Sequence, residues 1–386
     1  MTLIVREAQS FRELAPEWEA LLPRCPVRTP FMYPYWCELW WQHFAERRLL
    51  VTDTLKLLEV RDGGGALRAV TPFVVTTRPS LPWLNIRSVR PIGADPNVTE
   101  LSTLICAPED EAGVVSALLD YFVARRGEWD LLSLGDVRAD SDSVGMLGGR
   151  AGLRWTGEVS DYVLTLPADW ETFRSSLKRN IKESLRKCYN APRREGLTPE
   201  LRVRAAPAEV AAALERWLHL HTMRADRTDT VIHRNVFAVD PPRAFLRATV
   251  AQLAAQGLTR IFELELNGQV VASRIGFVLG DTLYLYFSGY DPAFGQYSVM
   301  TTTVAEAIKW AIEQGLKTVN LSPGNDVSKT RWSPDEVRYR RAVLPTPSLR
   351  GPILHRIVQW VTATPAASLF SFARRQSHRT LISPSA

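Results

Sequence analysis

The segment from Arg260 to Ser288 constrains the fold most, because it has the pattern of three consecutive antiparallel strands. Two apolar runs flank Asn267-Gly268, a dipeptide typical of the tight turn of a β-hairpin. Gly280-Asp281 forms a second turn into Thr282–Ser288, where apolar and tyrosine side chains alternate as along a strand. A helix is expected over Val299–Gln314. This order predicts an antiparallel sheet with helices packed on it.

The first half of the chain repeats this pattern in a weaker form. Two apolar runs flank Gly63-Gly64-Gly65, which predicts another hairpin, and a helix over Glu111–Arg126 precedes a strand over Trp129–Leu134. In both halves a helix ends at a glycine and leads into a strand, so the two halves have a similar order of elements. We therefore predict an α/β (α+β) protein with two tandem lobes, 1–165 and 166–345, each a mainly antiparallel mixed sheet flanked by helices.

One predicted helix holds most of the net charge. Apolar residues at spacings of three and four from Trp170 to Cys188 predict a single helix of about five turns, capped by Asp169 and ended by Pro192. The segment Arg174–Arg194 contains eight basic residues and one acidic residue, whereas the whole chain has a net charge of +6. Any polyanion would therefore be expected at this helix.

Several classes of protein lack support in the sequence. No run of 18 apolar residues predicts a spanning helix, and the N-terminus lacks the features of a secretory signal, so the expected location is the cytoplasm. Cysteines and histidines show no zinc spacing, so no metal is expected. Pro79–Asn97 is expected to be a loop. The tail, 346–386, has a short amphipathic run that either packs on the body or makes a peripheral membrane contact.

Three parts of the sequence together resemble a known family. They are the run from FELELNGQVVASRIGF to VNLSPGNDVSKTRW, the segments LKRNIKESLRKCYN and HLHTMRADR, and TPFMYPYWCELWWQHF in the first half. They resemble the BioF2-like, cellulose-biosynthesis-associated (CelD-like) branch of the GNAT acyltransferase superfamily, which is related to the Fem-type aminoacyltransferases. The resemblance implies two GNAT-like lobes and acyl-CoA, acetyl-CoA or longer, as co-substrate. The Fem-type relation implies aminoacyl-tRNA as the alternative donor.

The resemblance also implies where the donor binds. In GNAT folds the pantetheine arm lies between two strands that splay apart, and the pyrophosphate contacts backbone N–H groups at the start of the next helix. The residues implied for acyl-CoA are Tyr286, Ser288, Phe294, Gly295, Gln296, Tyr297 and Ser298. The loop keeps one glycine where the superfamily pattern is glycine-rich, so an ordinary strand-to-helix loop is the alternative.

Acyl transfer to an amine needs a group that removes a proton from nitrogen and one that protonates the departing thiolate. His221 is the first candidate base because imidazole titrates near neutral pH, and the resemblance directs it, with Arg224, toward the acceptor. Tyr290 and Asp291 are second candidates at the end of the central strand, where a tyrosine can protonate the thiolate. A core or solvated histidine and a turn-capping Asp291 stay open as alternatives.

Lys329 and Trp332 resemble the lysine-x-x-aromatic signature of the family. Lys329 would bind an acidic acceptor or a phosphate, and Trp332 would form a wall of the cleft. Trp36 is expected to line the same cleft from the first half of the chain. A salt bridge for the lysine and core positions for both tryptophans are the alternatives.

The sequence thus predicts an N-acyltransferase that moves an acyl group from acyl-CoA to a primary amine of a small molecule or amino sugar. A Fem-like transferase and a non-catalytic glycan- or partner-binding protein are the alternatives. Three roles stay open for the basic helix: it contacts the adenosine 3′-phosphate, it binds tRNA, or it is a solvated face. Because no aromatic residue is expected among its basic residues, tRNA is not the expected partner.

Overall fold

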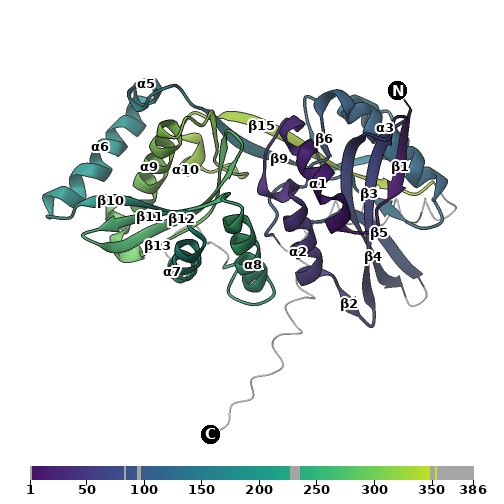
Figure 1. The fold of residues 1–386 in the computed structure, drawn as a ribbon, viewed down its shortest axis with the longest axis horizontal. Helices are drawn as coiled ribbons and strands as arrows, with labels where there is room; N and C mark the ends of the chain where they lie inside the picture. The colour runs from purple at the N-terminus through teal and green to yellow at the C-terminus, as the bar shows by residue number, and fades with distance from the viewer. Residues whose placement is uncertain (1, 82–83, 94–96, 227–234, 348–352, 354–386) are drawn as a thin grey trace, which may run out of the picture.

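The computed structural model describes residues 2–81, 84–93, 97–226, 235–347 and 353. Two lobes of mixed α/β structure lie side by side and are joined by two long strands (Figure 1). We call residues 1–165 the N-terminal lobe and residues 166–345 the C-terminal lobe, and these boundaries stay a prediction. Within the described residues no helix is long and apolar enough to cross a bilayer.

The N-terminal lobe consists of a sheet with helices on its faces. Its helices are α1 (Phe11–Leu21), η1 (Leu22–Arg24), η2 (Pro30–Met32), α2 (Pro34–Phe44), η3 (Pro108–Asp110), α3 (Glu111–Ala124) and α4 (Asp142–Gly148). Its strands are β1 (Leu3–Glu7), β2 (Arg47–Arg48), β3 (Val51–Asp62), β4 (Leu67–Leu81), β5 (Leu84–Pro91), β6 (Ile105–Cys106), β7 (Leu131–Leu132), β8 (Asp136–Arg138) and β9 (Arg154–Thr165).

The C-terminal lobe has the same kind of construction. Its helices are α5 (Trp170–Ser176), α6 (Arg179–Arg194), α7 (Pro207–Ala225), α8 (Pro242–Ala255), η4 (Pro292–Tyr297), α9 (Val299–Glu313) and α10 (Val327–Thr330). Its strands are β10 (Pro199–Arg204), β11 (Thr259–Leu266), β12 (Gln269–Leu279), β13 (Thr282–Tyr290), β14 (Thr318–Asn320) and β15 (Asp335–Pro345).

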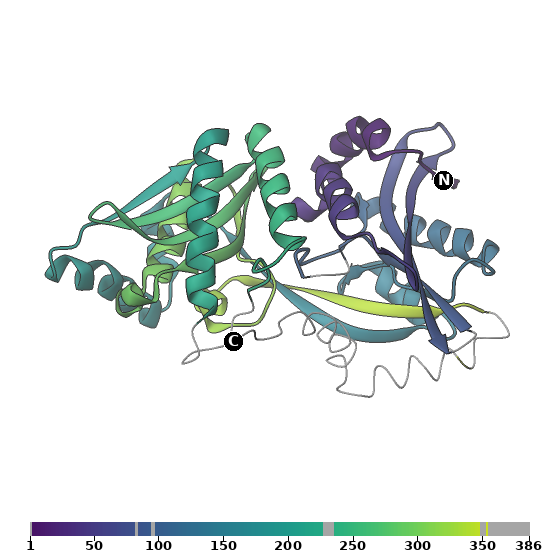
Figure 2. The same ribbon diagram turned by 90° about the horizontal axis from the view of Figure 1, so that it is seen from below.

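The two lobes exchange strands. In the order β1-β3-β4-β5-β7-β15-β9-β14-β13-β12-β11-β10, the C-terminal strand β15 pairs with β7 of the N-terminal lobe, and β9 pairs with β14 of the C-terminal lobe. β9 and β15 also pair with each other in antiparallel register along most of their length. Figure 2 shows these two strands running together from one lobe to the other. The predicted fold class, a two-lobed mixed α/β protein, is confirmed.

A shared hydrophobic core fills the contact between the lobes. The ring of Trp36 on α2 lies 5.1 Å from the ring of Phe245 on α8 and 5.9 Å from that of Tyr286 on β13, measured between centroids. Trp36 has no exposed surface. The sequence predicted that Trp36 lines a cleft. Instead it packs in the core, where its burial stabilises the contact between the lobes.

The local patterns were predicted with mixed success. Both glycine-turn hairpins and the start of α9 are confirmed. The single helix predicted from Trp170 is wrong, because Leu177 has an extended backbone and separates α5 from α6. Pro192 lies inside α6 rather than ending it.

The segment 79–97 was also predicted wrongly as a loop. Most of 79–91 belongs to β4 and β5, whose residues pair with each other up to Pro79 and Leu81. Prolines at the ends of strands need not donate to the ladder, so they do not prevent pairing there. The amphipathic run predicted in 346–386 falls almost wholly outside the described residues.

Candidate functional site

The central feature of the site is a gap between β13 and β14. The two strands are parallel and pair only at three positions, from Thr282 with Thr318 to Tyr284 with Asn320. On its other side β13 stays paired with β12 as far as Tyr290. In the part of the chain that the structure describes, no strand pairs with β13 beyond Tyr284 on the β14 side. The sheet therefore opens here into a V.

A β-bulge lies beside the opening. The register between β12 and β13 shifts between Arg274 and Gly276, so β13 has extra residues opposite Ile275. Bulges bend a strand and increase its twist, and they redirect its side chains. The bulge thus helps to turn the second half of β13 away from β14.

Arg274 ties the two strands together at the apex of the V. Its Nη2 lies 3.2 Å from the carbonyl oxygen of Leu285 on β13 and 3.5 Å from that of Leu321 just after β14. The residue is buried, and this burial lowers the pKa of its guanidinium to about 10. The apex of the gap is therefore occupied by Arg274, and no described strand bridges its wider part.

The turn after β13 leads directly to the start of α9. Asp291 caps η4, since its carboxylate accepts a hydrogen bond from the N–H of Ala293 at 2.9 Å. Phe294, Gly295 and Gln296 lie on η4, and Ser298 adopts a left-handed conformation with a φ of 55° as the residue before α9. The predicted backbone contacts for phosphates thus lie next to the gap.

The side chain of Tyr297 is directed away from this turn. It is buried among side chains of β11 and β12, and its hydroxyl donates a hydrogen bond to Glu195 after α6. Only the backbone of Tyr297 remains for the predicted donor contact. Tyr286 is similarly buried, 1% exposed, with its hydroxyl donating to the carbonyl oxygen of Val98 in the N-terminal lobe.

Arg331 is a cation beside the start of α9 that the sequence reasoning missed. Its Nη1 lies 3.4 Å from Oγ1 of Thr301 in the first turn of α9, and its Nη2 donates to Oγ of Ser184 on α6 at 2.7 Å. A cation and a helix N-terminus both favour an anion. Its position, one residue before Trp332 of the signature, was the only signal in the sequence.

His221 and Arg224 both contact the end of β13. Nδ1 of His221 lies 3.0 Å from the carbonyl oxygen of Ser288, and Nη1 of Arg224 donates to Oγ of Ser288 at 2.6 Å. The helix α7 can approach this closely because residue 289 is glycine, where a Cβ would lie 2.4 Å from the backbone nitrogen of His221. Arg224 also lies over the ring of Tyr290, 5.8 Å from its centroid.

The surroundings of His221 are mostly aromatic. Its ring stacks on Trp217 at a centroid distance of 4.8 Å and has edge contacts with Phe237 and Phe287. Only 4% of the residue is exposed. The role of His221 as a base stays a prediction, and this packing equally suits a histidine of the core.

Lys329 lies on α10, across the gap from β13. Its ammonium donates to the carbonyl oxygen of Pro323, and burial lowers the pKa of the lysine although the carboxylates of Glu100 and Asp326 act in the opposite direction. The ring of Trp332 is 2% exposed and packs with the core beneath α9. Trp332 therefore does not form a wall of a cleft, whereas Lys329 stays a candidate.

A crevice of about 450 Å³ opens beside the gap, with walls from both lobes. The N-terminal lobe provides segments around Pro91, Glu100 and Asp136, and the C-terminal lobe provides Phe287, Pro323 and Gly324. Because Phe287 belongs to β13 and Pro323 follows β14, the crevice adjoins both strands of the V. Its volume suits a small molecule.

Glu100 is one of two carboxylates that line this crevice, Asp136 being the other, and no sequence pattern assigned Glu100 a role. The hydroxyl of Tyr284 donates to its Oε2 at 2.5 Å. Burial raises the pKa of Glu100 to about 7, with the hydrogen bond from Tyr284 and the charge of Lys329 acting against the shift. The N-terminal lobe, for which the sequence indicated no chemistry, thus contributes a titratable group next to β13.

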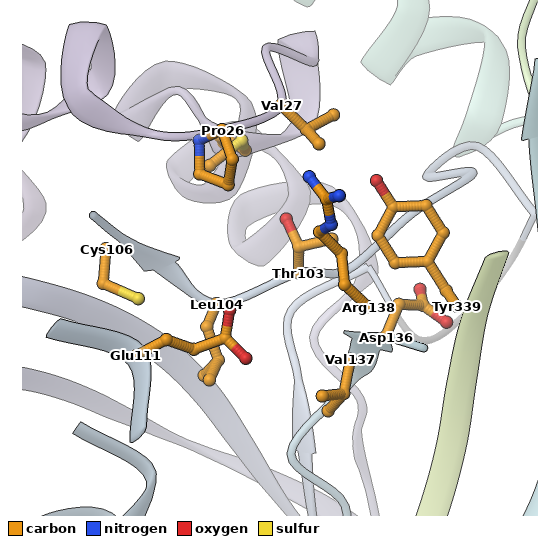
Figure 3. A pocket seen from close by; sticks show the side chains of 11 residues that line it. Pro26, Val27, Thr103, Leu104, Cys106, Glu111, Asp136, Val137, Arg138 and Tyr339 are labelled. Carbon is orange, nitrogen blue, oxygen red and sulfur yellow. The ribbon is translucent and has the colours of Figure 1, made fainter. Parts of the chain in front are cut away.

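A second cavity, lined among others by Pro26 and Val27 after η1, by β8 and by Tyr339 on β15, is too small for a substrate (Figure 3). Its volume is about 20 Å³, close to that of a single water site. Glu111 and Tyr339 both line it, and among the described residues neither Oε1 of Glu111 nor the hydroxyl of Tyr339 has a hydrogen-bond partner. A buried water is the occupant that fits.

The basic segment forms one wall of a groove of about 710 Å³ between α5, α6 and α9. Basic residues line it together with two aromatic ones: Arg174, Lys182, Arg186, Arg193, Lys309, Trp170 and Tyr189. The expectation that no aromatic side chain lies among these basic residues is therefore wrong. Within the described chain no three His, Cys, Asp or Glu side chains are grouped so as to hold a metal ion.

Comparison with known proteins identifies one domain. Residues 175–333 match the model of the acetyltransferase (GNAT) domain, and this range contains both strands of the V, α9 and Lys329. The search of curated proteins gave no match. The narrower BioF2-like branch was not named by these comparisons and stays a prediction.

Two solved structures are similar over most of their length. The crystal structure of FemX has a TM-score of 0.58 at 10% identity, over 88% of this chain and 97% of that chain. The C-terminal domain of a proposed lysylphosphatidylglycerol synthetase from Agrobacterium fabrum has a TM-score of 0.50 at 13% identity, over 86% of this chain and 92% of that chain. At these identities the likeness concerns the fold. Residues 175–333 thus match a GNAT acetyltransferase domain, and the two-lobed mixed α/β fold is similar to that of these structures.

Proposed function

We propose that this protein is an N-acyltransferase that transfers an acyl group from acyl-CoA to a primary amine of a small molecule. The observation that carries the proposal is the opening of the sheet between β13 and β14 after Tyr284. A thioester held in this V would lie next to a crevice large enough for the acceptor. Both reactants would then meet within one site.

The donor side of the proposal rests on the order of elements along the gap. The V would take the pantetheine arm, and the short turn through Gly295 and Gln296 would bring the phosphates to the first turn of α9. Arg331 supports an anion there through its contact with Thr301. The adenosine 3′-phosphate would lie further out, near the basic residues of α6.

The acceptor side rests on the crevice between the lobes. It combines cationic, acidic and apolar side chains, among them Arg90, Glu100 and Phe287. Such a lining suits an amino sugar or an amino acid, which carry an ammonium group and several hydrogen-bonding groups. Lys329, which contacts Pro323 in the wall of the crevice, would bind an acidic group of the acceptor, and Tyr290 would return a proton to the thiolate.

Thermal unfolding with acetyl-CoA and octanoyl-CoA tests the donor. A ligand that binds only the folded state at 100 times its Kd stabilises it by about 2.7 kcal/mol, which raises Tm. We expect Arg331→Gln to weaken binding by about 10-fold to 100-fold, because a charge-assisted hydrogen bond is lost. The matched control is Arg12→Gln, on the exposed face of α1. Wild-type protein whose Tm stays constant with both thioesters would contradict the proposal.

An aminoacyl-tRNA donor is the second candidate, and one observation favours it. The groove along α6 combines five basic side chains with Trp170 and Tyr189, and bases stack on aromatic rings beside such cations. Under this alternative, Lys182→Glu with Arg186→Glu would abolish binding of a charged tRNA, and RNase would remove activity. Acyl-CoA would then leave Tm unchanged.

A further inference from the structure

We propose that Glu100, from the N-terminal lobe, is the group that removes the proton from the acceptor amine. This inference rests on the proposed function, because it names the base of that same site. It implies that the active site is completed across the contact between the lobes, and that the N-terminal lobe takes part in the chemistry.

The position of Glu100 is fixed by contacts with the donor strand. Tyr284 and Tyr286 on β13 both direct their hydroxyls away from α9 and into the segment after β5, where they donate to Glu100 and to the carbonyl oxygen of Val98. Nε1 of Trp36 donates to Oγ1 of Thr99 at 2.9 Å. Three consecutive residues are thus held against the hydrophobic core that the two lobes share.

These contacts place the carboxylate at the start of the V. Its partner Tyr284 is the last residue of β13 that pairs with β14. Glu100 also lines the crevice, together with Phe287 and Gly324. An amine in that crevice would therefore lie between the carboxylate and a thioester held in the V.

Four charged or titratable groups act on Glu100 from the elements around it. They are Tyr284 on β13, Lys329 on α10, Asp161 on β9 and Arg274 on β12. Burial raises the pKa of Glu100 to about 7, so the carboxylate accepts a proton near neutral pH and releases it again. A strongly acidic carboxyl would be a much weaker base.

The other carboxyl of this cluster is less accessible. Burial also raises the pKa of Asp161, to about 6, but that residue has no exposed surface and does not line the crevice. One of its oxygens accepts a hydrogen bond from Nδ2 of Asn320 at 2.6 Å. His221 likewise lines no part of the crevice. Asp136 also lines the crevice, but its carboxylate is held by Arg341 and by the N–H of Ser102, so we assign the role to Glu100.

The proton balance of the step is simple. The acceptor arrives as R–NH3⁺ and transfers one proton to the carboxylate of Glu100. The freed lone pair attacks the thioester carbonyl carbon, a C–N bond forms, and the C–S bond breaks. A second proton leaves the nitrogen and converts the thiolate to the CoA thiol. The products are the amide and CoA, and Glu100 then releases its proton to water.

The test measures CoA release from acetyl-CoA with glucosamine, lysine and water as acceptors, over pH 5 to 9. Glu100→Gln keeps an oxygen that accepts from Tyr284, so the fold should persist. We expect kcat/KM to fall by about 10²-fold to 10⁴-fold, the usual contribution of a general base. The limb of the pH profile that rises near pH 7 should disappear, while the stabilisation by acetyl-CoA stays as in the wild type.

Two further variants separate a base from a structural carboxylate. Tyr284→Phe removes a hydrogen bond that favours the charged form of Glu100, so the rising limb should move to higher pH. Glu59→Gln, a half-buried carboxylate paired with Arg61 away from the crevice, should leave rate and profile unchanged. A purely structural Glu100 would lower Tm without moving the pH profile.

The outcomes distinguish this inference from the function on which it rests. If acetyl-CoA stabilises the protein and Glu100→Gln retains the wild-type rate and pH profile, the inference is wrong and the proposed function stands. If acetyl-CoA does not bind the wild type, the proposed function itself is wrong. A wild type that binds acetyl-CoA and releases no CoA even to water would contradict both.

Discussion

The two lobes contain the same parallel strand pair but differ in the connection after its longer strand. In the N-terminal lobe β5 pairs with β7 at Ser88 and Val89, and in the C-terminal lobe β13 pairs with β14. In each lobe a helix, α3 or α9, precedes the shorter strand. In each lobe the short strand has a strand of the other lobe as its next neighbour, β15 or β9.

In the N-terminal lobe the connection beyond the pair packs beside Asp136 and forms a wall of the crevice between the lobes. The connection from β5 to α3 is long enough to form β6 and to lay Ser102 and Thr103 beside Asp136. The N–H of Asp136 donates to the carbonyl oxygen of Ser102 at 2.9 Å, and the carboxylate of Asp136 accepts from the N–H of Ser102 at 2.8 Å. Arg341 pairs with the same carboxylate.

The connection in the C-terminal lobe is short, and the opening stays unfilled. Between β13 and α9 the chain forms only η4 and its two flanking residues. One strand arrangement thus yields either a packed junction, which forms a wall of the crevice, or a gap beside a short turn, and the two connections differ in length. A donor is therefore expected in the C-terminal lobe alone.

The largest expected effect comes from disrupting the packed junction, where Gly135 lies against Ser102. Gly135 has a φ of 98°, and a Cβ there would lie 2.1 Å from the carbonyl oxygen of Ser102. Gly135→Ala should lower the free energy of unfolding by about 3 kcal/mol, from backbone strain and overpacking together. Urea unfolding followed by circular dichroism measures this. Binding of acetyl-CoA per folded molecule should stay unchanged, and a weakened affinity would contradict the placement of the donor in the V rather than in the crevice, which Gly135 lines.

The next effect sharpens the contrast between the two carboxylates that line the crevice, Asp136 and Glu100. Asp136 is paired with a guanidinium, whereas Glu100 has a tyrosine hydroxyl and a pKa raised by burial to about 7. Between pH 4.5 and 7 the folded state then holds more protons at Glu100 than the unfolded state, so this group contributes less stability as pH rises. Stability of Glu100→Gln relative to wild type should increase by about 2 kcal/mol over this range and level off above it. Urea unfolding at several pH values checks this, and a constant difference would show that Glu100 is not perturbed.

The smallest effect concerns the ion pair between Arg341 and Asp136 at the packed junction. Arg341 is 46% exposed, so its pairing with Asp136 is screened by water. Arg341→Met should lower the free energy of unfolding by about 1 kcal/mol. The same urea titration measures the loss, with Arg12→Met as the control for removing a surface cation. A loss above about 3 kcal/mol would mean that Asp136 behaves as a buried charge without a partner.

Features set by neighbouring residues could be predicted from the sequence. Asn267-Gly268 determines a turn by its own backbone preference, and Asp169 caps α5 through the N–H of Thr172, three residues away. The break at Leu177 escaped prediction because the apolar spacing continues across it, while Ser175 and Ser176 bond back to backbone carbonyls and Lys182 donates to the carbonyl oxygen of Ser175.

Features set by distant residues could not be predicted. β9 and β15 were missed because their arginines and acids resemble a solvated segment, and only their mutual pairing makes them strands. Glu100 has no local motif; it becomes a site residue through Tyr284, which lies 184 positions further along the chain. The alternation of Tyr284 and Tyr286 on one face of a buried strand was the available signal, since buried hydroxyls need acceptors.

The exchange of β9 and β15 bears on how the chain is made. The sheet of the N-terminal lobe gains its neighbour for β7 only when residues up to Pro345 have been synthesised. Domains generally acquire structure in the order in which they leave the ribosome, but here the earlier half must wait for the later one. During that interval the edge of β7 is exposed, and the nascent protein depends on rapid completion, or on a chaperone, to avoid pairing with another chain.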